Sequence, residues 1–130
     1  DALAEAASSI VSVMGASAIT CFTSSGSTVR RVARERPSAS ILALTPRSDT
    51  ARKLGLTWGV HAVRTKDIGN FEEMIGKARR MALRHGMSEK GGKIVVLAGV
   101  PFGTPGSTNV LHVAAIRGDE LKGRDESPSF

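Results

Sequence analysis

Five short apolar runs alternate with helix-forming segments along this chain, and this alternation restricts the fold more than any other feature. The runs have the length of β-strands and cover residues 18–22, 41–45, 58–63, 93–99 and 109–116. The segments with helical spacing or with Gly and Pro stop signals cover residues 3–14, 28–36, 48–54 and 70–85. Strands and helices that alternate at this spacing indicate βαβ units, and hence a parallel sheet with helices on both faces.

The connection between the fourth and fifth runs is different, because no helical segment lies between them. The intervening stretch, AGVPFGTPGS, has only about ten residues, which favours an antiparallel fifth strand. The expected fold class is therefore α/β, a three-layer α/β/α sandwich whose five-stranded sheet is mostly parallel with the last strand antiparallel. We expect this domain to cover residues 1–118, followed by a polar, disordered tail at 119–130.

Individual side chains predict the faces and ends of the helices. The spacing of apolar residues predicts that the first helix buries Leu3, Ala7, Ile10 and Met14. Either Ser48 or Asp49 is expected to cap the third helix. Asn70 and Glu73 have the spacing of a capping box at the start of the longest helix.

Composition places the chain among ordinary globular domains. It has 130 residues, 41% of them apolar, which is enough to bury a core without disulfides or metals. Its single cysteine, Cys21, lies inside an apolar run and favours a reducing compartment, so we expect a cytoplasmic location. No apolar run approaches the length of a membrane span, and no membrane partner is expected. Because the chain starts with Asp1 and has no signal-peptide pattern, we interpret it as a piece of a longer protein.

The net charge of +6 raises the question of nucleic-acid binding. Aromatic residues make up only 4% of the chain and tyrosine is absent, so no stacking platform for single strands is visible. The basic residues form two modest groups, at 30–36 and 77–84, that are typical of solvated helix faces. We therefore expect no nucleic-acid partner, although a basic nucleic-acid-binding domain remains a third hypothesis.

A polar loop follows the first strand at the edge of the sheet where open α/β folds bind ligands. It combines one glycine with hydroxyl side chains and opens the next helix, whose free N–H groups and dipole favour an anion. Its residues are Thr23, Ser24, Ser25, Gly26, Ser27 and Thr28, and Arg30 and Arg31 follow. The spacing does not match a Walker A loop. Because Ser and Thr are also preferred helix caps, simple capping and anion binding are equally supported by this loop alone.

A second polar loop shifts that balance towards an anion. It leaves the fourth strand at the same edge and extends over residues 99–109, longer than a hairpin requires. Its glycines permit close approach of the backbone, and Arg64 and Lys66 after the third strand are possible sources of additional positive charge. Two polar, glycine-containing loops at one edge predict a phosphate cradle.

Five motifs occur in order along residues 1 to 117, namely the TSSGST loop, RPSASILALTP, TARKL, WGV and GTPGSTN. Together they resemble the carboxyl-terminal domain of pyruvate kinase. The resemblance implies a βα sandwich with five strands that carries no catalytic residues and no cofactor of its own. Transfer of phosphate from phosphoenolpyruvate to ADP would occur on a separate domain of the parent enzyme, with Mg²⁺ or Mn²⁺ and usually K⁺.

The resemblance also implies two roles for this domain, contact between subunits of a tetramer and binding of a phosphorylated effector. The effector phosphate would lie on residues 23–28, and a loop would close over its sugar, formed by Gly103, Thr104, Pro105, Gly106 and Ser107. Ser27 stands where the family often has arginine, and the segment RTKDIGNFEE lacks the tryptophan typical of members that bind fructose 1,6-bisphosphate. The expected effector is therefore a sugar monophosphate or a nucleotide monophosphate.

No catalytic or metal-binding motif competes with this interpretation. His61, His85 and His112 are far apart in sequence, and the two in strands are expected to be packed or hydrogen-bonded. Cys21 is expected to be a core residue, and Trp58 is expected to start the third strand and pack under a helix. The rival hypothesis is an assembly-only module in which strand 109–116 pairs with its copy across a two-fold axis.

Overall fold

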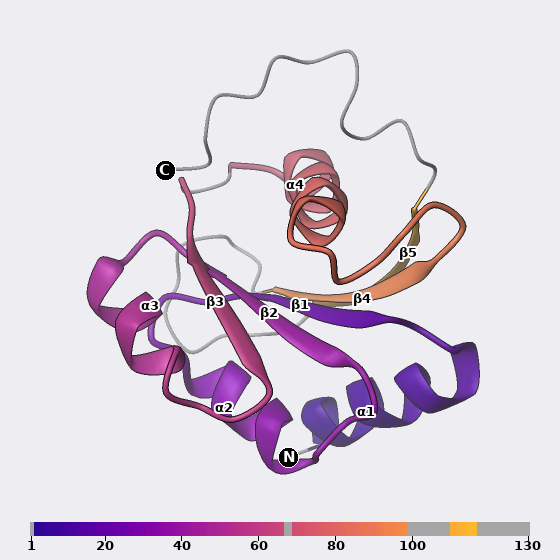
Figure 1. The fold of residues 1–130 in the computed structure, drawn as a ribbon, viewed down its shortest axis with the longest axis horizontal. Coiled ribbons are helices and arrows are strands. Elements are labelled where there is room, and N and C mark those ends of the chain that lie inside the picture. The colour runs from indigo at the N-terminus through magenta and orange to yellow at the C-terminus, as the bar shows by residue number, and fades with distance from the viewer. Residues whose placement is uncertain (1, 67–68, 99–109, 117–130) are drawn as a thin grey trace.

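The computed structural model describes residues 2–66, 69–98 and 110–116. Four helices and five strands alternate through them in the predicted order (Figure 1). They are α1 (Ala2–Met14), β1 (Ala18–Phe22), α2 (Ser27–Arg34), β2 (Ser40–Thr45), α3 (Ser48–Leu54), β3 (Val60–Arg64), α4 (Phe71–Arg84), β4 (Lys93–Ala98) and β5 (Val110–Ala115). The tail predicted at 119–130 lies outside the described residues.

The strands form one sheet in the order β3-β2-β1-β4-β5. Neighbours among the first four strands run parallel, and β5 pairs antiparallel with β4, with Val96 opposite His112. This arrangement confirms the predicted fold class, including the antiparallel last strand.

The strand order reverses its direction between β1 and β4. From β1 the chain moves outward to β2 and β3, and α4 then carries it back to the other side of β1. The register pairs Cys21 with Leu97, so β1 and β4 end side by side at the same edge of the sheet. Such a switch in strand order is where open α/β sheets place their ligand sites.

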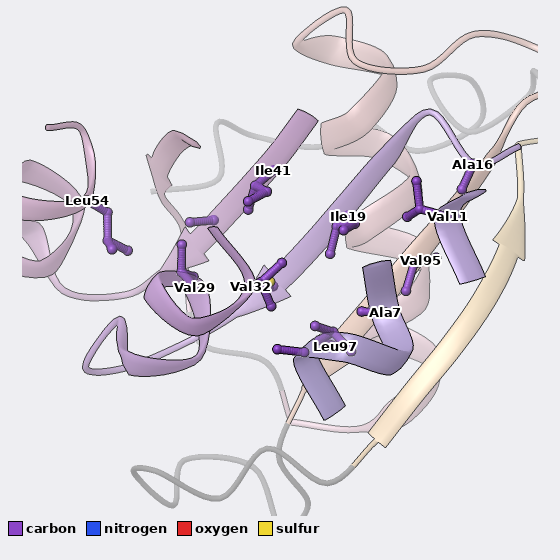
Figure 2. Packing of buried hydrophobic residues seen from close by; sticks show 13 residues of the cluster. Ala7, Val11, Ala16, Ile19, Val29, Val32, Ile41, Leu54, Val95 and Leu97 are labelled. Atoms are coloured by element: carbon purple, nitrogen blue, oxygen red, sulfur yellow. The ribbon is translucent and has the colours of Figure 1, made fainter. Parts of the chain in front are cut away.

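Helices cover both faces of the sheet, as Figure 1 shows, with α1, α2 and α3 on one face and α4 on the other. Figure 2 shows the first core, in which Val11, Val29 and Val32 from the helices lie over Ile19 and Val95 of the strands. The second core lies under α4, where Met74, Ala78 and Met81 pack on the opposite face of β1, β2 and β4. Alternate residues of each central strand supply the two cores, as the period of a strand requires.

The buried face of α1 agrees in part with the predicted one. Ala7 is buried as predicted, and Leu3 and Ile10 are half-buried against the same core. The other buried residues are Ala4 and Val11, whereas Met14 is 41% exposed. The row of buried residues along α1 is therefore shifted by about one residue from the predicted row. Small residues occupy the contact, which lets the helix backbone approach the sheet and α2 closely.

Several predicted boundaries are also corrected. Helix α2 ends at Arg34 rather than at residue 36, since Arg36 has a φ of 50° and Pro37 disfavours helical backbone before it. Strand β3 begins at Val60, because Val60 N–H donates to the Thr57 carbonyl and closes a turn over the first two predicted strand residues.

The two predicted helix caps have different outcomes. Asn70 Oδ1 accepts a hydrogen bond from Glu73 N–H at 2.8 Å, which confirms the cap of α4. The Glu73 carboxylate accepts from Gly69 N–H at 3.1 Å, one residue before the usual partner of a capping box. In α3 the prediction is wrong, because the helix starts at Ser48 and its N-cap is Arg47, which makes no side-chain capping bond.

Candidate functional site

The polar loop Thr23–Thr28, which we call the anion loop, leaves β1 at the switch point. Thr23 N–H donates to the Leu44 carbonyl at 3.0 Å and so extends the pairing of β1 with β2. The Thr23 hydroxyl then accepts from Gly26 N–H at 2.7 Å. This bond closes a tight turn that directs the chain from the sheet edge into α2.

Gly26 is the residue that this turn requires. It is the N-cap of α2 and has a φ of 87°, a conformation that only glycine adopts at low cost. A Cβ at this position would lie 3.0 Å from Cδ2 of Leu54 in α3. The predicted role of Gly26 as the turning point of the loop therefore agrees with the structure, and its close neighbour is a side chain of the core.

A hydrogen bond from α3 also holds the anion loop. Thr50 Oγ1 donates to the Ser24 carbonyl at 2.7 Å, and Thr50 itself is buried. The loop backbone is thus held from two sides, by β2 at Thr23 and by α3 at Ser24. A binding loop with a fixed backbone loses little conformational entropy when a ligand arrives.

The serines present the accessible hydroxyl groups of the anion loop. Ser25 is exposed, and its Oγ lies 3.3 Å from both Oγ and backbone N of Ser27. Both distances are long for hydrogen bonds, so phosphate oxygens are chemically suitable replacements for these partners. Thr28 differs from the serines, since it is only 5% exposed and its Oγ1 accepts from Arg31 Nη2 at 3.3 Å.

Positive charge is present at the start of α2. Arg30 Nη1 donates to the Ser25 carbonyl at 3.4 Å, which places the guanidinium beside the exposed serine. The first turn of α2 contains no Asp or Glu that would oppose this charge. A guanidinium and a helix N-terminus next to exposed hydroxyls form a chemically suitable surface for a phosphate group.

The predicted accessory cations lie farther away. Arg64 is the last residue of β3 and Lys66 follows that strand. Strand β3 is two strands from β1 in the sheet, or roughly 10 Å at ordinary strand spacing. Arg64 Nε donates to the Pro46 carbonyl at 3.3 Å, in the connection between β2 and α3. The structure thus places both residues at the predicted edge of the sheet, but two strands away from the anion loop.

The second predicted loop, Gly103–Ser107, lies outside the described residues. Strand β4 ends at Ala98, and the residue before Ala98, Leu97, is paired with Cys21 of β1. The last described residue before the second loop therefore lies beside the end of β1.

Comparison with known proteins identifies the family to which this fold belongs. A family model described as "Pyruvate kinase, alpha/beta domain" matches residues 1–114. A pyruvate kinase from Methylorubrum extorquens is 46% identical over 116 residues, covering 89% of this chain and 24% of the relative. The chain belongs to the pyruvate kinase α/β-domain family.

Other pyruvate kinases support the same assignment. The one from Clostridium acetobutylicum is 43% identical over 101 residues, covering 78% of this chain and 21% of the relative. A crystal structure of a pyruvate kinase from Cryptosporidium parvum superposes with a TM-score of 0.78 at 26% identity, covering 88% of this chain and 22% of that one. The chain therefore spans about a quarter of the length of these pyruvate kinases. The predicted resemblance to a pyruvate kinase C-terminal domain is confirmed.

Within the pyruvate kinase domain, two of the three histidines meet although the sequence did not suggest it. His61 Nε2 in β3 lies 3.3 Å from His85 Nδ1 at the C-cap of α4. Burial, together with the neighbouring His61 and Arg84, lowers the pKa of His85. His112 is separate and makes an edge contact with the Phe71 ring. The sequence alone does not predict this contact, because 24 residues separate His61 and His85. The two rings meet only because α4 packs back across the sheet.

Cys21 and Trp58 have opposite outcomes. Cys21 is a fully buried core residue, as predicted, and burial raises the pKa of its thiol to about 12. The prediction for Trp58 is wrong, since it lies in the turn before β3, is 77% exposed and has the Arg36 guanidinium 5.0 Å from its ring. A hollow of about 360 Å³ lies beside it, lined in part by Arg30 and Arg34.

The described residues contain neither a cluster of three or more metal ligands nor a helix suited to span a membrane. Among residues 2–66, 69–98 and 110–116, no three His, Cys, Asp or Glu side chains gather closely enough to hold a metal ion. No helix in these ranges is both long enough and apolar enough to span a membrane.

Proposed function

We propose that this chain is the regulatory and assembly domain of a cytoplasmic pyruvate kinase, and that its anion loop binds the phosphate of an effector. The parent enzyme transfers phosphate from phosphoenolpyruvate to ADP on another domain, where its Mg²⁺ or Mn²⁺ and K⁺ act. In this proposal the domain itself supplies no catalytic group. The observation that carries the proposal is the position of the anion loop at the switch between β1 and β4.

The chemistry of the loop supports a single phosphate. Ser25 and Ser27 offer hydroxyls, α2 offers its N-terminal N–H groups, and Arg30 offers positive charge beside Ser25. Arg64, the side chain suited to a second phosphate, contacts Pro46 instead, two strands away. The preferred effectors are therefore sugar monophosphates or nucleotide monophosphates rather than bisphosphates.

The regulatory mechanism is a shift of population between two arrangements of a tetramer. An effector that binds one arrangement more tightly favours it and so changes substrate affinity on a distant domain. The domain contributes contacts to that tetramer, and the effector acts by changing their balance.

The second candidate is an assembly-only function, and one observation favours it. Strand β5 lies at the end of the sheet, so one of its edges has no neighbouring strand within the described residues. An edge strand of this kind pairs readily with its copy across a two-fold axis. In this alternative the anion loop serves only as a helix cap and binds no ligand.

Thermal unfolding of the 130-residue chain separates these functions. Glucose 6-phosphate, AMP, fructose 1,6-bisphosphate, sulfate and an oligonucleotide are tested at increasing concentration. A monophosphate at one hundred times its dissociation constant should stabilise the fold by about 2.7 kcal/mol. Stabilisation by no anion would support the assembly-only function, and stabilisation by the oligonucleotide alone would support nucleic-acid binding.

A charge variant shows whether the anion loop is responsible. Ser25→Asp places a carboxylate beside the proposed phosphate, so like-charge repulsion should remove most of the stabilisation by the monophosphate. Ser38→Asp is the matched control, because Ser38 lies after α2, away from the anion loop. Equal loss in both variants would mean that only the net charge of the domain matters.

A further inference from the structure

The facing nitrogens of His61 and His85 have a separation that fits two ligands of one metal ion as well as it fits a long hydrogen bond. The distance from His61 Nε2 to His85 Nδ1 is 3.3 Å, and the ring centroids are 5.0 Å apart at an interplanar angle of 52°. Hydrogen bonds from N–H donors to oxygen have a mode of about 2.9–3.0 Å, so 3.3 Å is towards the long end for a hydrogen bond. Two imidazole nitrogens bound to one tetrahedral Zn²⁺, each at about 2.0–2.1 Å, lie about 3.3–3.4 Å apart.

The fold holds each ring of this pair on a separate element. His61 is in β3, the edge strand of the sheet, and its ring lies on the α4 side, where it meets His85. His85 follows α4 directly, and its N–H donates to the Met81 carbonyl at 3.0 Å, which fixes the backbone of the cap. The convergence of the two nitrogens therefore results from the packing of α4 against the sheet.

Access and charge further define what this pair can bind. His61 is exposed and His85 half-buried, so water can complete the coordination of an ion held there. No third His, Cys, Asp or Glu of the described residues joins the pair, and the nearby Arg84 opposes positive charge. These features suit an ion with strong affinity for imidazole and do not suit Mg²⁺ or Ca²⁺, which prefer oxygen ligands.

We propose that His61 and His85 form a two-histidine site for a divalent transition-metal ion of the Zn²⁺ type, which fastens the edge strand β3 to the end of α4. Both imidazoles bind as neutral ligands, with their remaining protons on His61 Nδ1 and His85 Nε2. Water molecules occupy the other coordination positions. This site is separate from the anion loop. The anion loop follows the C-terminal end of β1, whereas His61 lies near the N-terminal end of β3, which runs in the same direction.

The proposal is tested on the 130-residue chain with Zn²⁺ as the probe and Mg²⁺ as the control ion. We expect Zn²⁺ to raise the melting temperature and Mg²⁺ to leave it unchanged. His61→Asn and His85→Asn should each lose the rise, whereas His112→Asn, which removes the separate third histidine, should keep it. A rise that persists in either of the first two variants would overturn the proposal.

Nuclear magnetic resonance of the imidazole rings provides a readout that does not depend on stability. One equivalent of Zn²⁺ should shift the ring signals of His61 and His85 together and leave those of His112 in place. Buried Cys21, whose pKa is about 12, does not compete for the ion in the folded state. Unchanged signals from His61 and His85 would mean that the two rings share only a hydrogen bond, and the proposal would then be wrong.

Discussion

At the scale of single residues, Gly26 determines the shape of the anion loop. Its φ of 87° is costly for any residue with a side chain, and Leu54 approaches the position that a Cβ would take. Both constraints come from packing of α2 and α3 on the sheet. The loop geometry that we propose for phosphate binding therefore depends on the packing of the core.

We expect Gly26→Ala to lower the free energy of unfolding by about 2–3 kcal/mol, since it combines left-handed backbone strain with the contact at Leu54. Gly15→Ala is the matched control, because Gly15 has a φ of 68° but no atom within 4 Å of the point where a Cβ would lie. The control should lose only about 1–2 kcal/mol. Urea unfolding of both variants measures the difference, and equal losses would show that Leu54 does not restrict the site.

Cys21 offers a second test at this scale. Because burial raises the pKa of its thiol to about 12, almost no thiolate exists in the folded protein at about pH 8, and the sulfur is inaccessible. We expect a thiol reagent such as Ellman's reagent to modify Cys21 only as fast as the chain unfolds. The stability linked to this thiol is present below its unfolded pKa of about 8.5 and should be lost as the pH rises from there towards 12. Rapid modification in native buffer would contradict the structure of β1.

At the scale of elements, the sequence predicts correctly the order and type of the helices and strands in the described residues, because each has an apolar pattern or Gly and Pro stop signals of its own. The sequence patterns do not predict which side chains are buried where contacts between elements determine burial. The buried face of α1 follows the small residues that fit against α2, and the exposed position of Trp58 follows the turn before β3.

The strand order could be predicted only in part. Local pattern indicates which strands are parallel, but nothing in it shows that α4 returns the chain to the far side of β1. For the same reason the meeting of His61 and His85 could not be predicted. The anion loop could be predicted, because its hydroxyls, its glycine and the helix that follows are contiguous in sequence.

The two predicted helix caps provide a test at the element scale. Asn70→Ala removes the bond to Glu73 N–H and should destabilise the fold by about 1 kcal/mol. Ser48→Ala should change stability by less than about 0.5 kcal/mol, because Arg47 rather than Ser48 occupies the N-cap of α3. Thermal unfolding of both variants measures these changes, and a larger loss for Ser48→Ala would contradict the observed start of α3.

At the scale of the whole molecule, the sheet places the anion loop, the N-terminus of α2 and Arg30 at one edge, and we propose that they hold the phosphate of an effector. The chain spans about a quarter of its pyruvate kinase relatives, so any effect of an effector must be transmitted through contacts between domains or subunits. The fixed backbone of the anion loop, held by Leu44 and Thr50, is suited to transmit binding to β2 and α3.

The most direct test of the central claim follows the backbone amide signals of the domain during titration with glucose 6-phosphate or AMP. The account predicts saturable shifts, at one ligand per chain, centred on Gly26, Ser27 and Thr28 and absent in Ser25→Asp. Amide signals of this loop that stay in place while the ligand binds elsewhere, or while no ligand binds at all, would contradict it.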